Sequence, residues 1–435
     1  MNRIGRLNWP AFVLVVFSAA IFMFKHHLVK LHPNQESRRI NAGTPAAILA
    51  TSFPIQMCLT PQMDEAEPVG NPKVAGGELP PIRLVTDPYP TFNGITLDSG
   101  NNRIALSDEN RKSVLVYDRV AGDNSSGVTP PLHQIIGPDS QIGYIAGVMF
   151  DPAHHEIYAV NNDLDDRIVV FDDEAHGDIK PKRRLYVPHQ AWGLSLNPAA
   201  DQFAISVQQL SMVAIYRREA QGLEAPLRII EGPDTGLADP HGIHWDVKHH
   251  ELFVANHGNS SVIASYSAYD AGVSSHALSL GGHFLQPSLT VFQDSAESNA
   301  KPLRTIQGKR TRLNWPMGID VDTEHEEIAV ADNGDNSILI YRRSASGDTE
   351  PVRVIRGTRT GIVSPMGVAI DVKNDEIWVA NYGDHTAVVF ARTANGNVVP
   401  KRIIRNAPQG TPTGGFGNPY AVAYDSKRDQ LLVPN

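Results

Sequence analysis

The chain has 435 residues, of which 41% are hydrophobic, and its formal net charge at pH 7 is −9. The acidic balance, with both signs interspersed, excludes the basic surface that nucleic-acid binding needs, so we expect no nucleic-acid partner. The single cysteine, Cys58, excludes an intrachain disulfide and a cysteine-rich metal site. The 31 prolines and 35 glycines predict many turns.

The chain opens with an apolar segment. Two arginines precede an uncharged run from Trp9 to Phe24, which ends at a lysine. This pattern is typical of a secretion signal or an uncleaved anchor, and the only small-x-small cleavage motif lies inside the run, which favours an anchor. We therefore predict a hydrophobic signal-anchor or transmembrane helix in residues 1–30 and a flexible linker in residues 31–74. The protein is then membrane-anchored through this segment only and extracytoplasmic (periplasmic or extracellular), or secreted if the signal is cleaved.

A unit of about 50 residues recurs through residues 75–435. Its first strand begins at a glycine followed by Ile, Val or Leu and closes with Asp or Asn, and two further apolar strands and a Pro-x-Arg segment follow. Short β-branched strands separated by Gly, Asn, Asp and Pro turns predict an all-β fold, a seven-bladed β-propeller with four-stranded blades. The seven starts are Gly94, Gly147, Gly193, Gly242, Gly318, Gly367 and, in degenerate form, Ala421.

Two features concern the ends of the ring. Pro81–Val85 has the pattern of a fourth strand although it precedes the first unit, so we expect this N-terminal outer strand to close the ring. The last unit stops at Val433, after its second strand, which predicts an incomplete last blade and a truncated end. The outer strands alternate apolar residues with Arg or Lys, which we interpret as protection of a sheet edge.

The fourth unit carries an insertion between His257 and Pro287, in the loop that joins its second and third strands. The interval from Gly242 to Gly318 is 76 residues, against 46 to 54 elsewhere. Insertions on one face of a repeat protein mark a binding face in many cases, although a tolerated surface loop is the alternative.

The residues before the first-strand glycines and those after the second strands should ring one mouth of the central channel. The Asn or Asp after each second strand recurs, so we expect a structural role in turns for it. The remaining positions mix aromatic, Met, His and amide side chains, which suit a small organic or peptide ligand. The predicted ligand-binding residues are His189, Trp192, His241, His257, His283, Met317, Met366, Tyr382 and Tyr420.

His241, His244 and His257 depart from the repeat, and all three fall in the unit with the insertion. They are the candidate catalytic residues, because histidine acts as acid, base or metal ligand. No carboxylate stands at an obvious ligand spacing beside them, so no metal site and no cofactor are predicted. A divalent metal held by two or more of these residues and His189 stays open as an alternative.

Three segments resemble the NHL and YVTN families of propeller repeats: Pro316–Asp322, Ile328–Asp332 and Val379–Gly383. The resemblance covers roughly residues 74–435 and implies a propeller that serves as a scaffold, a ligand binder or, in a few members, an enzyme. The streptogramin lyases and gluconolactonase-like proteins are similar in blade pattern. Their Trp-Phe-Thr-Glu signature and Glu/Asn/Asp metal set are absent here, so no catalytic residue carries over.

Two hypotheses follow. The first is an anchored or exported propeller that serves as a ligand-binding or protein-interaction scaffold, with its binding face at the channel mouth near the fourth unit. The alternative is a lyase or lactonase-like hydrolase that uses a His-rich site at the same mouth. The lack of a catalytic motif favours the first, non-catalytic role.

Overall fold

The computed structural model describes residues 88–123, 127–162, 165–261 and 282–411 and two short strands near the C-terminus. The described residues belong to the second of two units into which the chain divides, Pro81–Asn435. The N-terminal apolar run, the linker and the Pro81–Val85 segment lie outside the described residues. Within the described ranges, no helix has the length and apolarity to cross a membrane.

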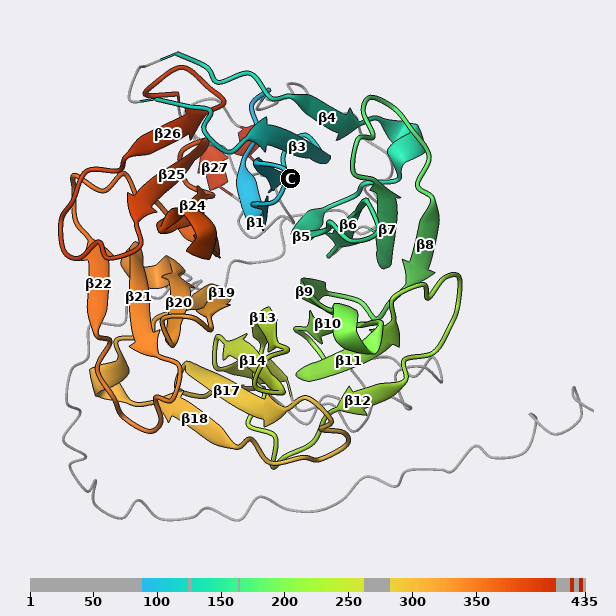
Figure 1. Ribbon diagram of the computed structural model, residues 1–435, viewed down its shortest axis with the longest axis vertical. Coiled ribbons are helices and arrows are strands. Elements are labelled where there is room, and N and C mark those ends of the chain that lie inside the picture. The colour runs from blue at the N-terminus through green and yellow to red at the C-terminus, as the bar shows by residue number, and fades with distance from the viewer. Residues whose placement is uncertain are drawn as a thin grey trace, which may run out of the picture. The chain divides into compact units, whose positions relative to one another are not determined.

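Six four-stranded antiparallel sheets form the blades of a β-propeller (Figure 1). The first blade contains β1 (Phe92–Asp98), β2 (Arg103–Asp108), β3 (Ser113–Asp118) and β4 (His133–Ile136). The second contains β5 (Ile145–Asp151), β6 (Glu156–Asn161), β7 (Arg167–Asp172) and β8 (Arg183–Tyr186). The third contains β9 (Ala191–Asn197), β10 (Gln202–Val207), β11 (Met212–Arg217) and β12 (Arg228–Ile230).

The other three blades repeat this order. The fourth contains β13 (Pro240–Asp246), β14 (Glu251–Asn256), β17 (Ser288–Gln293) and β18 (Arg304–Gln307). The fifth contains β19 (Pro316–Asp322), β20 (Glu327–Asp332), β21 (Ser337–Arg342) and β22 (Arg353–Arg356). The sixth contains β23 (Pro365–Asp371), β24 (Glu376–Asn381), β25 (Thr386–Ala391) and β26 (Arg402–Arg405). Short 3-10 turns are η1 (Pro138–Ser140), η2 (Pro198–Ala200), η3 (Lys309–Thr311), η4 (Asn333–Asp335) and η5 (Val372–Asn374).

The prediction of seven blades is wrong. The innermost strands contact one another in a cycle, β1 to β5, β9, β13, β19, β23 and back to β1, so six blades close the ring. The described residues of the seventh unit form β27 (Ala423–Asp425) and β28 (Gln430–Leu432), which pair with each other as a separate two-stranded sheet.

The glycines of the first strands explain this count. A Cβ on Gly318 would lie 2.8 Å from the Met366 carbonyl oxygen in the next blade, which is closer than real Cβ atoms approach. The same contact recurs around the ring, and a Cβ on Gly367 would lie 2.9 Å from the Asn93 oxygen of the first blade. The cycle of close approaches is therefore complete with six members. The seventh unit has Ala421 instead of glycine, and an alanine does not fit such a position.

The ring also closes, within the described residues, without an N-terminal strand. In blades two to six, a loop after the third strand bonds to the outer strand of the preceding blade. Gly177, for example, donates its N–H to the Gln134 carbonyl at 2.7 Å. At the junction of the sixth and first blades, the Asp123 carbonyl accepts the Ile403 N–H at 3.2 Å. Loops thus cover the outer edges of the blades.

The arginines of the outer strands have a different role from the edge protection that we predicted. In four blades one of them binds a glutamate at the start of the second strand in the same blade, as Arg183 binds Glu156 at 2.5 and 2.7 Å. Burial by itself raises the pKa of Glu156. The hydrogen bonds and charges of Arg183 and Lys182 outweigh burial and lower this pKa to about 2. The equivalent pairs are Arg304 with Glu251, Arg353 with Glu327 and Arg402 with Glu376.

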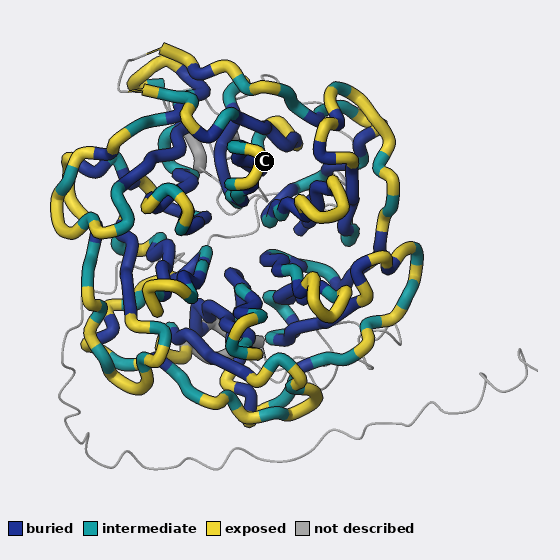
Figure 2. The backbone as a smooth tube through the Cα atoms, viewed as in Figure 1, coloured by how far each residue is buried: buried dark blue, intermediate teal, exposed yellow. Residues whose placement is uncertain are grey.

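Apolar side chains of the inner three strands pack between adjacent blades, and the exposed residues concentrate in the loops (Figure 2). The structural role predicted for the Asn or Asp after each second strand is confirmed. The Asp108 carboxylate accepts the Thr91 N–H at 2.9 Å, and the Asn256 side chain accepts the Ala238 N–H at 3.1 Å. These bonds tie the end of the second strand to the segment that enters the first.

Candidate functional site

Three positions in each blade build one mouth of the channel. A register shift in each blade, such as that between Pro240 and Ile243, turns the start of the first strand toward the end of the second. A backbone hydrogen bond then fixes the two segments, as His257 N–H donates to the Asp239 carbonyl at 3.1 Å. The eighteen mouth residues are Thr91, Tyr144, Gln190, Asp239, Trp315, Ser364, Asn93, Ala146, Trp192, His241, Met317, Met366, Glu109, Asn162, Gln208, His257, Asn333 and Tyr382.

The side chains of the mouth residues bond from one blade to the next. Asn162 donates to the Gln208 side-chain oxygen at 2.9 Å, and the Gln208 amide in turn contacts Nε2 of His241. The His257 Nε2 atom lies 2.6 Å from the Met317 sulfur. None of the eighteen mouth residues is Lys or Arg, so these eighteen side chains offer no positive charge to a phosphate or another anion.

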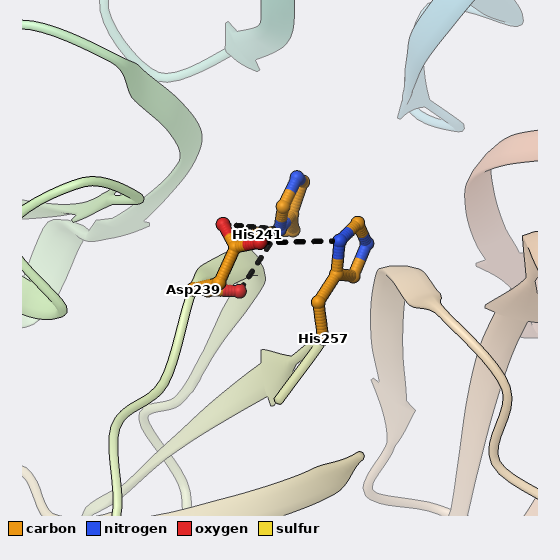
Figure 3. Close-up of side chains that lie close together, drawn as sticks. All are labelled: Asp239, His241 and His257. Atoms are coloured by element: carbon orange, nitrogen blue, oxygen red, sulfur yellow. Dashed lines mark hydrogen bonds and ion pairs between the residues drawn. The ribbon is translucent and has the colours of Figure 1, made fainter. Parts of the chain in front are cut away.

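The blade-four cluster, defined as Asp239, His241 and His257, brings three possible metal ligands close together (Figure 3). Asp239 lies in the loop before β13, His241 is the second residue of β13, and His257 follows β14. The two imidazoles stack, with ring centroids 3.5 Å apart and planes 18° apart. The two Asp239 carboxylate oxygens lie 3.7 Å from His241 Nδ1 and 3.6 Å from His257 Nδ1.

Burial controls the charge of this cluster. It lowers the pKa of His241 to about 3, and the neighbouring His257 lowers it too, while Asp239 acts in the opposite direction. Burial also lowers the pKa of His257 to about 3. The pKa of the Asp239 carboxyl is raised by burial, and His241 opposes that rise. Both imidazoles are therefore neutral at physiological pH, with one lone pair each.

Two tryptophans flank the histidines and extend the stack into an aromatic row of Trp192, His241, His257 and Trp315. Trp192 is tilted against His241 with ring centroids 4.7 Å apart, and Trp315 stacks on His257 at 5.5 Å. Trp315 is 51% exposed and has a φ of 58°, a left-handed conformation that is rare for a bulky side chain. The row thus begins at the channel and ends at an exposed indole.

A second buried acid lies across the mouth from the row. Glu109 receives hydrogen bonds from Asn93 at 2.7 Å and from the Tyr382 hydroxyl at 3.1 Å. Burial raises the pKa of Glu109 to about 7, while its bonds to Tyr144, Tyr382 and Asn93 act in the opposite direction. The Glu109 carboxyl therefore changes between its protonated and ionised forms near neutral pH.

The predicted residues separate into several groups. Trp192, His241, His257 and Met317 come together in or beside the blade-four cluster. Met366 and Tyr382 also belong to the mouth, but in the sixth blade. The side chain of His283 and all of Tyr420 lie outside the described residues.

His189 and His244 are placed elsewhere. His189 Nδ1 bonds to the Asp166 carboxylate at 2.8 Å, and His244 Nδ1 pairs with the Asp320 carboxylate at 2.7 Å. His244 lines the central channel, a cavity of about 430 Å³ walled by the first strands of all six blades. Trp192 lines the same cavity, so the aromatic row borders on the channel.

Sequence reasoning missed Asp239, Trp315, Gln208 and Glu109. Asp239 and Trp315 each stand three residues before a first-strand glycine, directly before a proline. Gln190 holds the same position in the third blade. A comparison of this position among the units would have shown that a carboxylate and an indole replace the amide in blades four and five.

The insertion begins beside the cluster, as the prediction of a long loop between the second and third strands requires. β15 (Asn259–Ser261) starts two residues after His257 and pairs with β16 (Gly282–Phe284). Residues 262–281, and with them most of the aromatic and histidine residues of the insertion, lie outside the described residues.

Comparison of the chain with protein-family models and with curated proteins found no match. The resemblance to NHL and YVTN repeats therefore stays a prediction from the residues. The propeller fold itself is established by the six blades.

Proposed function

We propose that this protein is a ligand-binding propeller whose mouth takes a small, uncharged molecule with a flat or sugar-like ring. The observation that carries the proposal is the aromatic row that ends at Trp315. Stacking on an exposed indole suits such rings, because an aromatic face offers a large contact area at a low cost in conformational entropy. The absence of Lys and Arg from the mouth residues argues against an anionic ligand.

The ligand would lie against Trp315 and Trp192 and reach toward the central channel. The cavity volume of about 430 Å³ falls in the range that small-molecule sites occupy, roughly 300–1,000 Å³. The polar side chains of Gln208 and Asn333, both half-buried at the mouth, provide hydrogen bonds that would orient it. The insertion, which starts beside His257, would border the same place.

The distances in the blade-four cluster favour binding over a lyase or hydrolase reaction at that cluster. A catalytic histidine is oriented by a hydrogen bond of about 2.6–3.2 Å to its partner. The Asp239 oxygens lie 3.6 and 3.7 Å from the two Nδ1 atoms, so the cluster contains no such dyad.

A thermal-shift screen tests the proposal. The full chain is heated with a panel of neutral sugars, aromatic compounds and short peptides, in the presence of EDTA so that metal ions play no part. We expect ring-bearing compounds to raise the melting temperature of the wild type and of Ser298→Asn, but not that of Trp315→Asn. Both variants place Asn at a left-handed position, and Ser298 is not a mouth residue. Hits that stabilise Trp315→Asn as strongly as the wild type would refute the assignment.

We also propose that the propeller works outside the cytoplasm, anchored or exported by its N-terminal segment. The support is the uncharged run from Trp9 to Phe24 and its flanking basic residues. Membrane fractionation of the full chain and of a chain lacking residues 1–30 tests this. Equal amounts of both chains in the cytoplasmic fraction would contradict it.

A further inference from the structure

We infer that the blade-four cluster is a binding site for a divalent first-row transition metal such as zinc. Two imidazoles and one carboxylate form a donor set that such ions bind in many proteins. Donor atoms of Asp239, His241 and His257 all lie within 4.8 Å of one another, and both histidines are buried. The inference concerns the same mouth as the proposed ligand but does not depend on it.

The distances distinguish this cluster from the hydrogen-bonded His–Asp pairs of the described residues. His154 with Asp151 and His249 with Asp246 close to 2.8 and 2.7 Å, as ordinary hydrogen-bonded pairs. The Asp239 oxygens instead stand 3.7 and 3.6 Å from their imidazole nitrogens. Two ligands about 2.1 Å from a tetrahedral ion are separated by roughly 3.4 Å, so the cluster has the spacing of ligands around an ion.

The protonation state of His257 also indicates a place for a cation. Its Nε2 atom lies against the Met317 sulfur, which can only accept a hydrogen, so we assign the ring proton to Nε2. The Nδ1 lone pair then faces an oxygen of the Asp239 carboxylate, 3.6 Å away, with no hydrogen between two acceptors. Among the described residues, no hydrogen bond reaches the Asp239 carboxylate from any other side chain or backbone N–H. A cation between them removes the repulsion and satisfies both groups.

His241 would complete the set after a change of tautomer. Its Nδ1 donates to the Asp239 carbonyl at 3.0 Å, and its Nε2 contacts the Gln208 amide. Transfer of the ring proton to Nε2 frees the Nδ1 lone pair, and a turn of the amide lets the Gln208 oxygen accept that proton. Because both rings are already neutral, their coordination releases no proton from them.

Coordination also requires the stacked rings to splay, since lone pairs in parallel planes do not converge on one ion. Trp315 lies on the outer face of His257 and is half exposed, so it is free to move when that ring turns. Metal binding should therefore change the fluorescence of Trp315. The part of the fluorescence change that comes from Trp315, but not the binding, should disappear in Trp315→Asn.

Titration calorimetry of the metal-stripped full chain with zinc chloride at pH 7.5 tests the inference. We expect one ion per chain, and at least a tenfold loss of affinity in Asp239→Asn and in His257→Gln. Asp239→Asn keeps the side-chain shape and suits the left-handed backbone at φ 53°, so the fold should survive. His249→Gln, which changes a histidine already paired at 2.7 Å, is the matched control and should bind zinc like the wild type.

Two results would overturn the inference. One is the absence of zinc binding to a folded wild-type chain. The other is equal binding by the wild type, Asp239→Asn and His257→Gln, which would mean that other surface histidines take up the ion. Because the ring-ligand screen runs in EDTA and depends on Trp315, failure there leaves the zinc titration unaffected, and the reverse also holds.

Discussion

Acid should weaken the fold through the blade-four cluster. In the folded protein His241 and His257 each have a pKa of about 3, because burial disfavours the charged imidazolium. Unfolding returns both to an ordinary value near 6.5, so the unfolded chain binds protons that the folded chain does not. The contribution of these neutral histidines to the free energy of unfolding is fully present above pH 6.5. It is lost as the pH falls from 6.5 toward 3. At pH 5.5, one unit below the unfolded value, each histidine removes about 1.4 kcal/mol from the free energy of unfolding.

Urea unfolding of the wild type and of His257→Gln at pH 7.5 and 5.5 measures this effect. Glutamine does not titrate, so the stability difference between the two proteins should shift by about 1.4 kcal/mol in favour of the variant at pH 5.5. Buried carboxyl groups such as Glu109 change the stability of both proteins alike and cancel in the comparison. An identical difference at the two pH values would show that His257 takes up its proton in the folded state, and would refute its assignment as a buried neutral base.

Three further predictions concern the rest of the molecule. Glu109→Gln should raise the free energy of unfolding by about 3 kcal/mol at pH 8 and by little at pH 4.5. The pKa of Glu109 is raised to about 7 in the folded protein, so ionisation of this carboxyl destabilises the fold as the pH rises above 4.5. Urea titrations at both pH values check this. Gly318→Ala should cost about 1–3 kcal/mol in thermal unfolding, whereas Gly347→Asn, at a φ of 69° with open space, should cost far less. Arg402→Met should cost about 2–3 kcal/mol, because the buried Glu376 loses one of its cations, and adding Glu376→Gln should restore part of the loss.

The fold of a single blade could be predicted from the sequence, but the number of blades could not. Strand order, the glycine starts and the turn role of residues such as Asn256 all follow from local pattern. The count depended on treating Ala421 as equivalent to Gly367. Only the close approach of adjacent first strands shows that the position excludes a Cβ and that the sixth blade already contacts the first.

The site was predicted in part, for a related reason. His241 and His257 were found because they break a repeated pattern, and the structure brings them together. His189 and His244 were grouped with them, but their carboxylate partners come from other segments of the chain, which spacing does not reveal. Trp315 was missed because the comparison among units ended at the residues next to the glycine.

The fold itself does not require the side chains of the blade-four cluster. The bond from His257 N–H to the Asp239 carbonyl is 3.1 Å long, the same as the equivalent bond from Asn333 to Trp315 in the fifth blade. The fifth blade has Met317 and Asn333 at the positions of His241 and His257. The same backbone bond forms there without the cost of burying two imidazoles. Blade four nevertheless combines two imidazoles, a carboxylate that receives no hydrogen bond from the described residues, and the start of the insertion at one place. Since the backbone is satisfied either way, the reason for these residues lies in what the mouth binds.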